Sequence, residues 1–273
     1  MKALNLFFIF ALGLLISGCT NSFAYMPEDI DGQGTLVIQG GGDRHPDIVK
    51  AIIENAGGAA SKILVVPFAS AYAAEVGPEQ AKEFSDAGCP SASYILCDKD
   101  KLDDPENMEK LRGVTGIFFS GGDQNRLVEY LSGTNFLEAI RRLYKGGAVV
   151  AGTSAGAAVM SEIMLTGSAT PGNSDEFNYF KKGAVETSTG FGFLKSIVID
   201  QHFVARKRQI RLLNVLMDNP GYRGIGIDEA TAIVVKPDNT MSVVGASKVM
   251  LFEPMADNSY KLTILSPGES CKL

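Results

Sequence analysis

The chain has 273 residues, of which 45% are hydrophobic and 21% are charged, with a formal net charge of −6. This composition is typical of one folded domain with a large core, and it argues against a disordered chain. The acidic balance also argues against nucleic acid as a partner.

The N-terminus carries a targeting pattern. Residues 1–18 hold one lysine followed by an apolar run, which indicates a signal sequence that is removed. The run ends in LISGC and resembles a bacterial lipoprotein signal, in which Cys19 becomes the lipidated N-terminus. We therefore expect a tether over 19–33, a single domain over 34–273, and an exported protein held by lipid on the outer side of a bacterial membrane. The alternative is an ordinary secretory signal that is cut near Ala24.

Three cysteines remain after Cys19, namely Cys89, Cys97 and Cys271. An odd number of cysteines leaves at least one cysteine without a disulfide partner in an exported protein. A disulfide between Cys89 and Cys97 is one possible pairing. The sequence has no CxxC motif and no His-Cys cluster, so we expect no metal site and no cofactor.

Short apolar runs alternate with amphipathic segments from Gly34 onward. The pattern predicts strands at 35–39, 62–67, 93–97, 116–120 and 148–151, with helices at 46–56, 77–87, 124–131 and 135–144. Strands that alternate with helices at this interval indicate a mainly parallel sheet with helices on both faces.

The C-terminal third has closely spaced strands separated by turns. Strands are predicted at 196–199, 225–227, 232–236, 241–244, 248–252 and 261–265. We expect them to form an antiparallel meander that completes an α/β domain. The long stretch 167–190 is rich in Gly, Ser, Thr and Asn, and we expect it to be an irregular loop that covers the substrate.

Ser154 is the candidate nucleophile. It lies in Gly152-Thr153-Ser154-Ala155-Gly156, directly after a predicted strand and before a predicted helix, which is the setting of an exposed serine on a tight turn. The backbone N–H of Ala155 would face an oxyanion at the positive end of that helix. The alternative is that these small residues only let a strand and a helix pack closely.

The sequence contains two histidines that could activate this serine. His45 precedes a helix in a turn, where histidine is often simply solvated. His202 ends an apolar strand, at the edge where open α/β sheets place their chemistry. We therefore favour His202 as the general base over the alternative of a buried histidine bound to a backbone carbonyl.

The base needs a carboxylate to orient it, and the candidates are Asp200, Asp228 and Glu229. Spacing does not choose among them. Each gives the chain order Ser, His, acid, whereas α/β-hydrolases have Ser, acid, His. Acids of the polar loop would restore the latter order but have no strand end to fix them: Asp175, Glu176 and Glu186.

Two further glycine-rich turns follow predicted strands. In the stretch FFSGGDQ, the N–H of Gly122 could supply a second oxyanion donor, and Gln124 could reach the substrate. The stretch 40–43, GGGD, has neither a GxGxxG pattern nor a Walker lysine, so nucleotide binding is not expected.

Four segments, GTSAGAAVM, FFSGGDQNRL, IDQHFVARKRQIRL and GIGIDEATA, resemble the cyanophycinase family of serine peptidases, which also contains aspartyl dipeptidase. The similarity runs from about residue 34 to 249. It implies a flavodoxin-like or class I glutamine-amidotransferase-like α/β fold and a Ser–His–Glu triad of Ser154, His202 and Glu229. The resemblance, and not the spacing, selects Glu229 over Asp228.

The resemblance also implies a set of substrate-pocket residues: Gln124, Asp200, Gln201, Arg206, Arg208 and Arg211. Cyanophycin is a poly-aspartate backbone that carries arginine on each side chain, so arginines would bind its carboxylates and acids its guanidinium groups. The three arginines stand at i, i+2 and i+5 and do not share one helix face. We therefore expect at least one of them to make only structural contacts.

The resemblance implies a serine exopeptidase that hydrolyses cyanophycin to β-Asp-Arg dipeptides through an acyl-enzyme. The alternatives are a peptidase of the same mechanism acting on aspartyl or isoaspartyl peptides, and a lipoprotein that binds peptide without cleaving it. The expected partners are a cyanophycin-like peptide or polymer and the membrane that holds the lipid anchor. The sequence leaves open whether the protein forms a homodimer. Export would suit the scavenging of polymer released by other cells.

Overall fold

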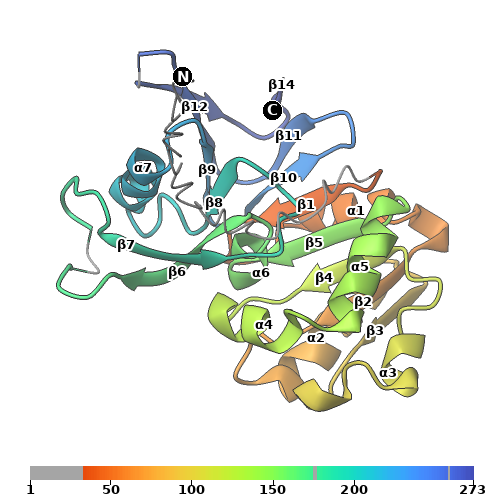
Figure 1. Ribbon diagram of the computed structural model, residues 1–273. Helices are drawn as coiled ribbons and strands as arrows, with labels where there is room; N and C mark the ends of the chain where they lie inside the picture. Colours follow the sequence, from red (N-terminus) through yellow and green to blue (C-terminus); the bar gives the residue numbers. More distant parts are fainter. Residues whose placement is uncertain (1–32, 175–176, 258) are drawn as a thin grey trace, which may run out of the picture.

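The computed structural model describes residues 33–174, 177–257 and 259–273 (Figure 1). The predicted signal sequence, Cys19 and nearly all of the predicted tether lie outside these residues. Over the part that is described, we find no helix with both the length and the apolar character needed to cross a membrane.

The main sheet has eight strands in the described residues. Five neighbouring strands are parallel, in the spatial order β1 (Leu36–Gln39), β5 (Val149–Thr153), β4 (Gly116–Phe119), β2 (Lys62–Val66) and β3 (Ser91–Tyr94). Antiparallel strands continue the sheet beyond β1, namely β10 (Thr231–Val235), β11 (Thr240–Gly245) and β14 (Ser270–Lys272).

Helices cover both faces of this sheet (Figure 1). Successive side chains of a strand point to opposite faces, so neighbouring residues enter different cores. Val37 packs in the core that includes α1 (Pro46–Asn55) and α2 (Ala73–Asp86). Ile38 packs in the core that includes α4 (Gln124–Leu131) and α5 (Asn135–Lys145). The predicted mainly parallel sheet between two helical layers is confirmed.

Shorter helical elements fill the connections. They are α3 (Pro105–Glu109) and two 3-10 turns, Gly58–Ala60 and Lys99–Lys101.

A second sheet of four strands stands beside the main sheet, in the order β13 (Tyr260–Leu265), β12 (Val249–Pro254), β9 (Arg223–Ile227) and β8 (Ile197–Asp200). Its β8 and β9 are parallel, and α7 (Gln209–Asp218) packs on them. The C-terminal strands from β9 to β14 pair antiparallel with one another, as expected, but they divide between two sheets and do not form one meander. The chain turns between β9 and β10 at Ala230, whose φ is 52°, and passes from one sheet to the other.

The predicted irregular loop 167–190 is partly structured. Its two ends belong to an antiparallel hairpin of β6 (Ile163–Ala169) and β7 (Val185–Thr189). Most of the side chains of β7 are exposed, and threonine and serine dominate it, so the hairpin has almost no hydrophobic alternation to reveal it.

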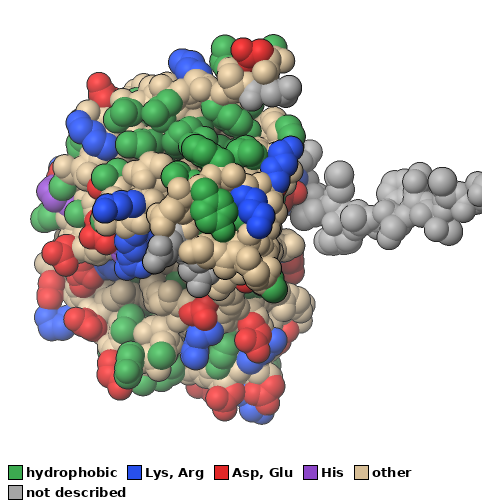
Figure 2. All heavy atoms as spheres, turned by 90° about the vertical axis from the view of Figure 1, so that its left-hand side faces the viewer, with side chains coloured by type: hydrophobic (Ala, Val, Ile, Leu, Met, Phe, Trp, Pro, Cys, Tyr) green, Lys and Arg blue, Asp and Glu red, His purple; other side chains and the backbone are tan. Residues whose placement is uncertain are grey.

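Apolar side chains gather on the upper part of the face shown in Figure 2, which is the left-hand side of Figure 1. The edge strand β13 exposes Leu262 and Ile264, and the turn before it exposes Met255.

The three described cysteines are all free thiols. Cys89 is buried, where its sulfur accepts a hydrogen bond from the hydroxyl of Ser61 at 3.3 Å. The Cys89–Cys97 bridge that the sequence left open is not formed.

Candidate active site

Ser154 occupies a strained turn between β5 and the four-residue helix α6 (Ala155–Ala158). Its φ of 53° and ψ of −107° lie outside the regions that non-glycine residues usually adopt. The N–H of Ser154 donates to the carbonyl of Gln39 at 3.1 Å, which fixes the turn to the end of β1.

The glycines on either side of Ser154 allow backbones to approach closely. A Cβ on Gly156 would lie 2.2 Å from the carbonyl oxygen of Phe119, and one on Gly152 would lie 2.4 Å from the carbonyl oxygen of Gly156. The lack of a side chain at Gly156 lets the turn sit against the end of β4, and its lack at Gly152 lets the backbone of Gly156 approach β5.

The structure brings Ser154, His202 and Glu229 into one hydrogen-bonded chain. The Oγ of Ser154 lies 2.9 Å from the Nε2 of His202, and the Nδ1 of His202 lies 2.6 Å from the Oε1 of Glu229. The three residues follow the ends of β5, β8 and β9. A hydroxyl, an imidazole and a carboxylate in this order can move a proton from the hydroxyl to the imidazole.

The surroundings of His202 favour its neutral form. Burial lowers the pKa of His202 below its ordinary value, the hydrogen bond with Glu229 raises it, and the charge of Arg206 lowers it again. The net shift is downward. An imidazole with a pKa below about 6.5 is mainly neutral at pH 7 and can accept a proton.

The glycine loop, residues 40–42, packs directly against the imidazole of His202 and the side chain of Glu229. A Cβ on Gly41, whose φ is +101°, would lie 2.3 Å from the Cε1 and Nε2 atoms of His202. A Cβ on Gly42 would lie 2.8 Å from the Cβ of Glu229. The carbonyl of Gly40 also accepts the N–H of His202 at 2.6 Å. From the sequence, this loop was weighed only as a phosphate site. Its run of three glycines after a strand was the signal of a close approach.

The other carboxylate considered at this strand end has different partners. Asp228 is buried, and it accepts hydrogen bonds from the N–H groups of Val204 and Ala205 at 3.0 and 2.9 Å and from the hydroxyl of Ser247 at 2.8 Å. Burial raises the pKa of Asp228, but these hydrogen bonds outweigh it and hold the pKa below its ordinary value. Asp228 therefore organises the segment after His202, while Glu229 contacts the imidazole.

Asp200 and Arg211 lie in the interior, where they pair with each other. Their exposed fractions are 1% and 4%, and Arg211 binds both oxygens of the Asp200 carboxylate, its Nε at 3.1 Å from Oδ2. The pair joins β8 to α7, and the substrate-pocket role that the resemblance implies for both residues stays a prediction. The contact of Arg211 with Asp200 is of the structural kind that we expected of at least one of the three arginines.

Gln201 and Arg208 lie next to the serine. The Nη1 of Arg208 donates to the backbone carbonyl of Gln201 at 2.7 Å and to its Oε1 at 2.8 Å, and this Oε1 lies 3.5 Å from the Oγ of Ser154. Burial lowers the pKa of Arg208 to about 10, which leaves the guanidinium charged at pH 7. Arg206 is exposed.

The remaining predicted residues lie in the turn after β4, on α4 and on α6. A Cβ on Gly121 would lie 3.4 Å from the Cβ of Ser154, so the turn that carries Gly122 borders the serine. The N–H groups of Gly122 and Ala155 stay the predicted oxyanion donors. Gln124 is 7% exposed, and its Nε2 donates to the carbonyl of Leu165 at 2.9 Å, which fixes α4 to β6.

His45 caps a helix and is not part of the hydrogen-bonded chain of Ser154, His202 and Glu229. Its Nδ1 accepts the N–H of Asp47 at 3.3 Å and so caps the start of α1. Among the described residues, no three histidine, cysteine, aspartate or glutamate side chains converge in a way that could hold a metal ion.

We predict that Gly41→Ala lowers peptidase activity at least about 100-fold, because the new methyl group displaces the imidazole. Gly88→Ala is the matched control, since Gly88 has a similar φ of +97° and nothing within 4 Å of its added Cβ. Steady-state kinetics of both purified variants measure the effect. Equal activity of the two variants would show that the glycine loop does not position His202.

Comparison with known proteins identifies the family. Residues 36–243 match the model of peptidase family S51. A cyanophycinase of Trichormus variabilis is 33% identical over 223 residues, which cover 80% of this chain and 73% of that protein. A cyanophycinase of Geminocystis herdmanii is 34% identical over 254 residues, which cover 86% and 91%.

A solved structure supports the same assignment. The crystal structure of a peptidase from an acI-B1 Actinobacterium superimposes with a TM-score of 0.69 and 25% sequence identity, over 89% of this chain and 98% of that one. The chain therefore belongs to peptidase family S51 and is a serine-type peptidase.

Proposed function

We propose that Ser154 is the nucleophile of this peptidase, that His202 is its general base, and that Glu229 orients the imidazole. The observation that supports this most strongly is the contact of 2.9 Å between the Oγ of Ser154 and the Nε2 of His202, with Glu229 bonded to the other ring nitrogen. All three groups follow strand ends, where rigid elements hold them in place.

In the first half of the reaction, the Oγ of Ser154 attacks the carbonyl carbon of a peptide bond while its proton passes to the Nε2 of His202. Glu229 stabilises the imidazolium that forms. The N–H groups of Ala155 and Gly122 donate to the oxyanion of the tetrahedral intermediate. The C–N bond then breaks, and the leaving amine takes the proton from His202, which leaves an ester on Ser154.

In the second half, a water molecule gives a proton to His202 and attacks the ester carbonyl. The C–O bond to Ser154 breaks, the proton returns to Oγ, and the carboxylic acid product leaves. The lowered pKa of His202 suits both halves, because the base must be neutral at the start of each.

The substrate that we propose is cyanophycin, which the enzyme cleaves at backbone peptide bonds to release β-Asp-Arg. The name that both curated relatives carry supports this choice. The charged guanidinium of Arg208 and the exposed side chain of Arg206 are suited to binding the α-carboxylates of the arginines that the polymer carries.

We predict that the protein releases β-Asp-Arg from insoluble cyanophycin, and that Ser154→Ala abolishes the release because no ester can form. Ser85→Ala, a change of an exposed serine on α2, is the control with unchanged release. Mass spectrometry of the soluble products is the measurement. Cleavage of aspartyl or isoaspartyl peptides with no release from the polymer would contradict cyanophycin as the substrate. Release by Ser154→Ala would contradict the nucleophile.

We also propose that the protein is exported and lipidated at Cys19, on the grounds of the apolar run that ends in LISGC. In a bacterial host, we predict incorporation of labelled palmitate that Cys19→Ser abolishes, with the protein moving from the membrane fraction to the soluble fraction. Unchanged labelling in the variant would contradict the assignment.

A further inference from the structure

Gln39, the last residue of β1, contacts two parts of the candidate site at once. Its exposed fraction is 1%. Its backbone carbonyl accepts the N–H of Ser154 at 3.1 Å. Its side-chain Nε2 lies 3.2 Å from the carbonyl oxygens of both Gly41 and Asp43, and 3.5 Å from that of Gly42. One buried residue thus links the serine turn to the glycine loop.

The glycine loop in turn contacts the other two residues of the triad, His202 and Glu229. Gly41 has no room for a Cβ beside the ring of His202, and Gly42 has none beside the Cβ of Glu229. The carbonyl of Gly41 also accepts the N–H of Ala230, the residue after Glu229, at 2.9 Å. A shift of the loop would therefore move the imidazole and the carboxylate relative to Ser154.

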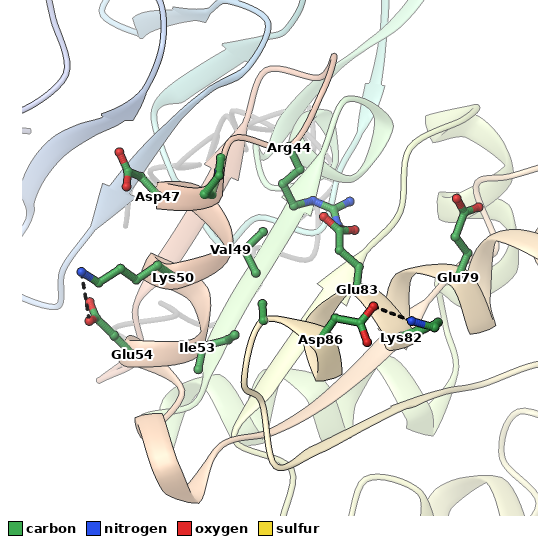
Figure 3. A pocket seen from close by; sticks show the side chains of 12 residues that line it. Arg44, Asp47, Val49, Lys50, Ile53, Glu54, Glu79, Lys82, Glu83 and Asp86 are labelled. Atoms are coloured by element: carbon green, nitrogen blue, oxygen red, sulfur yellow. Dashed lines mark hydrogen bonds and ion pairs between the residues drawn. The ribbon is translucent and has the colours of Figure 1, made fainter.

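Arg44, two residues after the glycine loop, is fixed by contacts of its own. Figure 3 shows Arg44 and Glu83 pointing toward each other in the groove between α1 and α2, and the two side chains form an ion pair. The guanidinium carbon lies 4.4 Å from the centroid of the Phe118 ring, and the side chain of Arg44 is 8% exposed. Arg44 thus holds the chain beyond the glycine loop, while the side chain of Gln39 binds the carbonyls of Gly41, Gly42 and Asp43.

We infer that Gln39 is a positioning residue for the peptidase reaction, whose side-chain amide holds the glycine loop against His202 and Glu229 so that the imidazole faces Ser154. In the part of the chain that the structure describes, the Oε1 of Gln39 has no hydrogen-bond partner, so the amide acts through its N–H donors. The inference rests on the roles proposed above for Ser154, His202 and Glu229.

Two substitutions of Gln39 in the full chain test the inference. Gln39→Met keeps the length of the side chain and removes both donors, and Gln39→Glu sets carboxylate oxygens against the three carbonyls. Thr115→Val is the control, because the Thr115 hydroxyl accepts the N–H of Lys62 at 2.8 Å at the opposite end of the sheet. The measurement is the second-order rate constant of labelling by a fluorophosphonate probe from pH 5 to 9, at a temperature where thermal unfolding shows every variant folded.

We expect both Gln39 variants to react at least about tenfold more slowly than the parent, and Thr115→Val to react within about twofold of it. We also expect the acid limb of the Gln39→Met profile to move to higher pH. Burial is the largest cause of the lowered pKa of His202. A loosened loop would let water reach the imidazole, and the pKa of His202 would therefore rise. The charged groups that face the ring, Glu229, Arg206 and Arg208, are unchanged in the variant.

Parental rates and a parental pH profile in both Gln39 variants, even with lower melting temperatures, would overturn the inference and leave Gln39 a structural residue only. A parent chain that the probe does not label would overturn the proposed nucleophile, and the inference with it. The two failures are therefore distinct.

Discussion

The contact between Ser154 and His202 depends on the placement of two sheets. Ser154 follows the central strand β5 of the main sheet, and His202 follows β8 of the second sheet, so the 2.9 Å between Oγ and Nε2 spans the junction of the two. That junction is tight because the glycine loop leaves no space beside the imidazole. The second sheet is thus the element that brings His202 and Glu229 to Ser154, which follows a strand of the main sheet.

The polar residues around His202 differ in their contacts, and several of them bind other parts of the same segment. Asp200 and Arg211 form a buried pair, and breaking such a pair by removing one partner typically costs about 3–5 kcal/mol because the other charge is left buried. Asp228 holds the N–H groups that follow His202. A segment dense in charged residues is therefore largely structural here, with Arg206 and Arg208 left near the serine.

The sequence predicted the architecture well where periodicity was strong. The helix expected at 124–131 has those bounds, and the parallel strands were each placed within a few residues. Ser154 and His202 could be identified because each follows a strand end. Spacing could not separate Asp228 from Glu229, since adjacent residues at the end of β9 reach the same edge, and only the resemblance to a family did so. Three features could not be predicted because they depend on contacts between separate segments, which no local pattern encodes. They are the pairing of the C-terminal strands, the polar hairpin β6–β7 and the contact of Gly41 with His202.

The central claim is that Ser154 reacts because His202 activates it, and the most direct measurement locates the covalent bond. The protein would be treated with a fluorophosphonate, digested and mapped by mass spectrometry, beside His202→Ala and His45→Ala. We predict one adduct per chain, on the peptide that contains Ser154, which is lost in His202→Ala and retained in His45→Ala. An adduct on another residue, or labelling of Ser154 that persists at the parental rate in His202→Ala, would contradict the account.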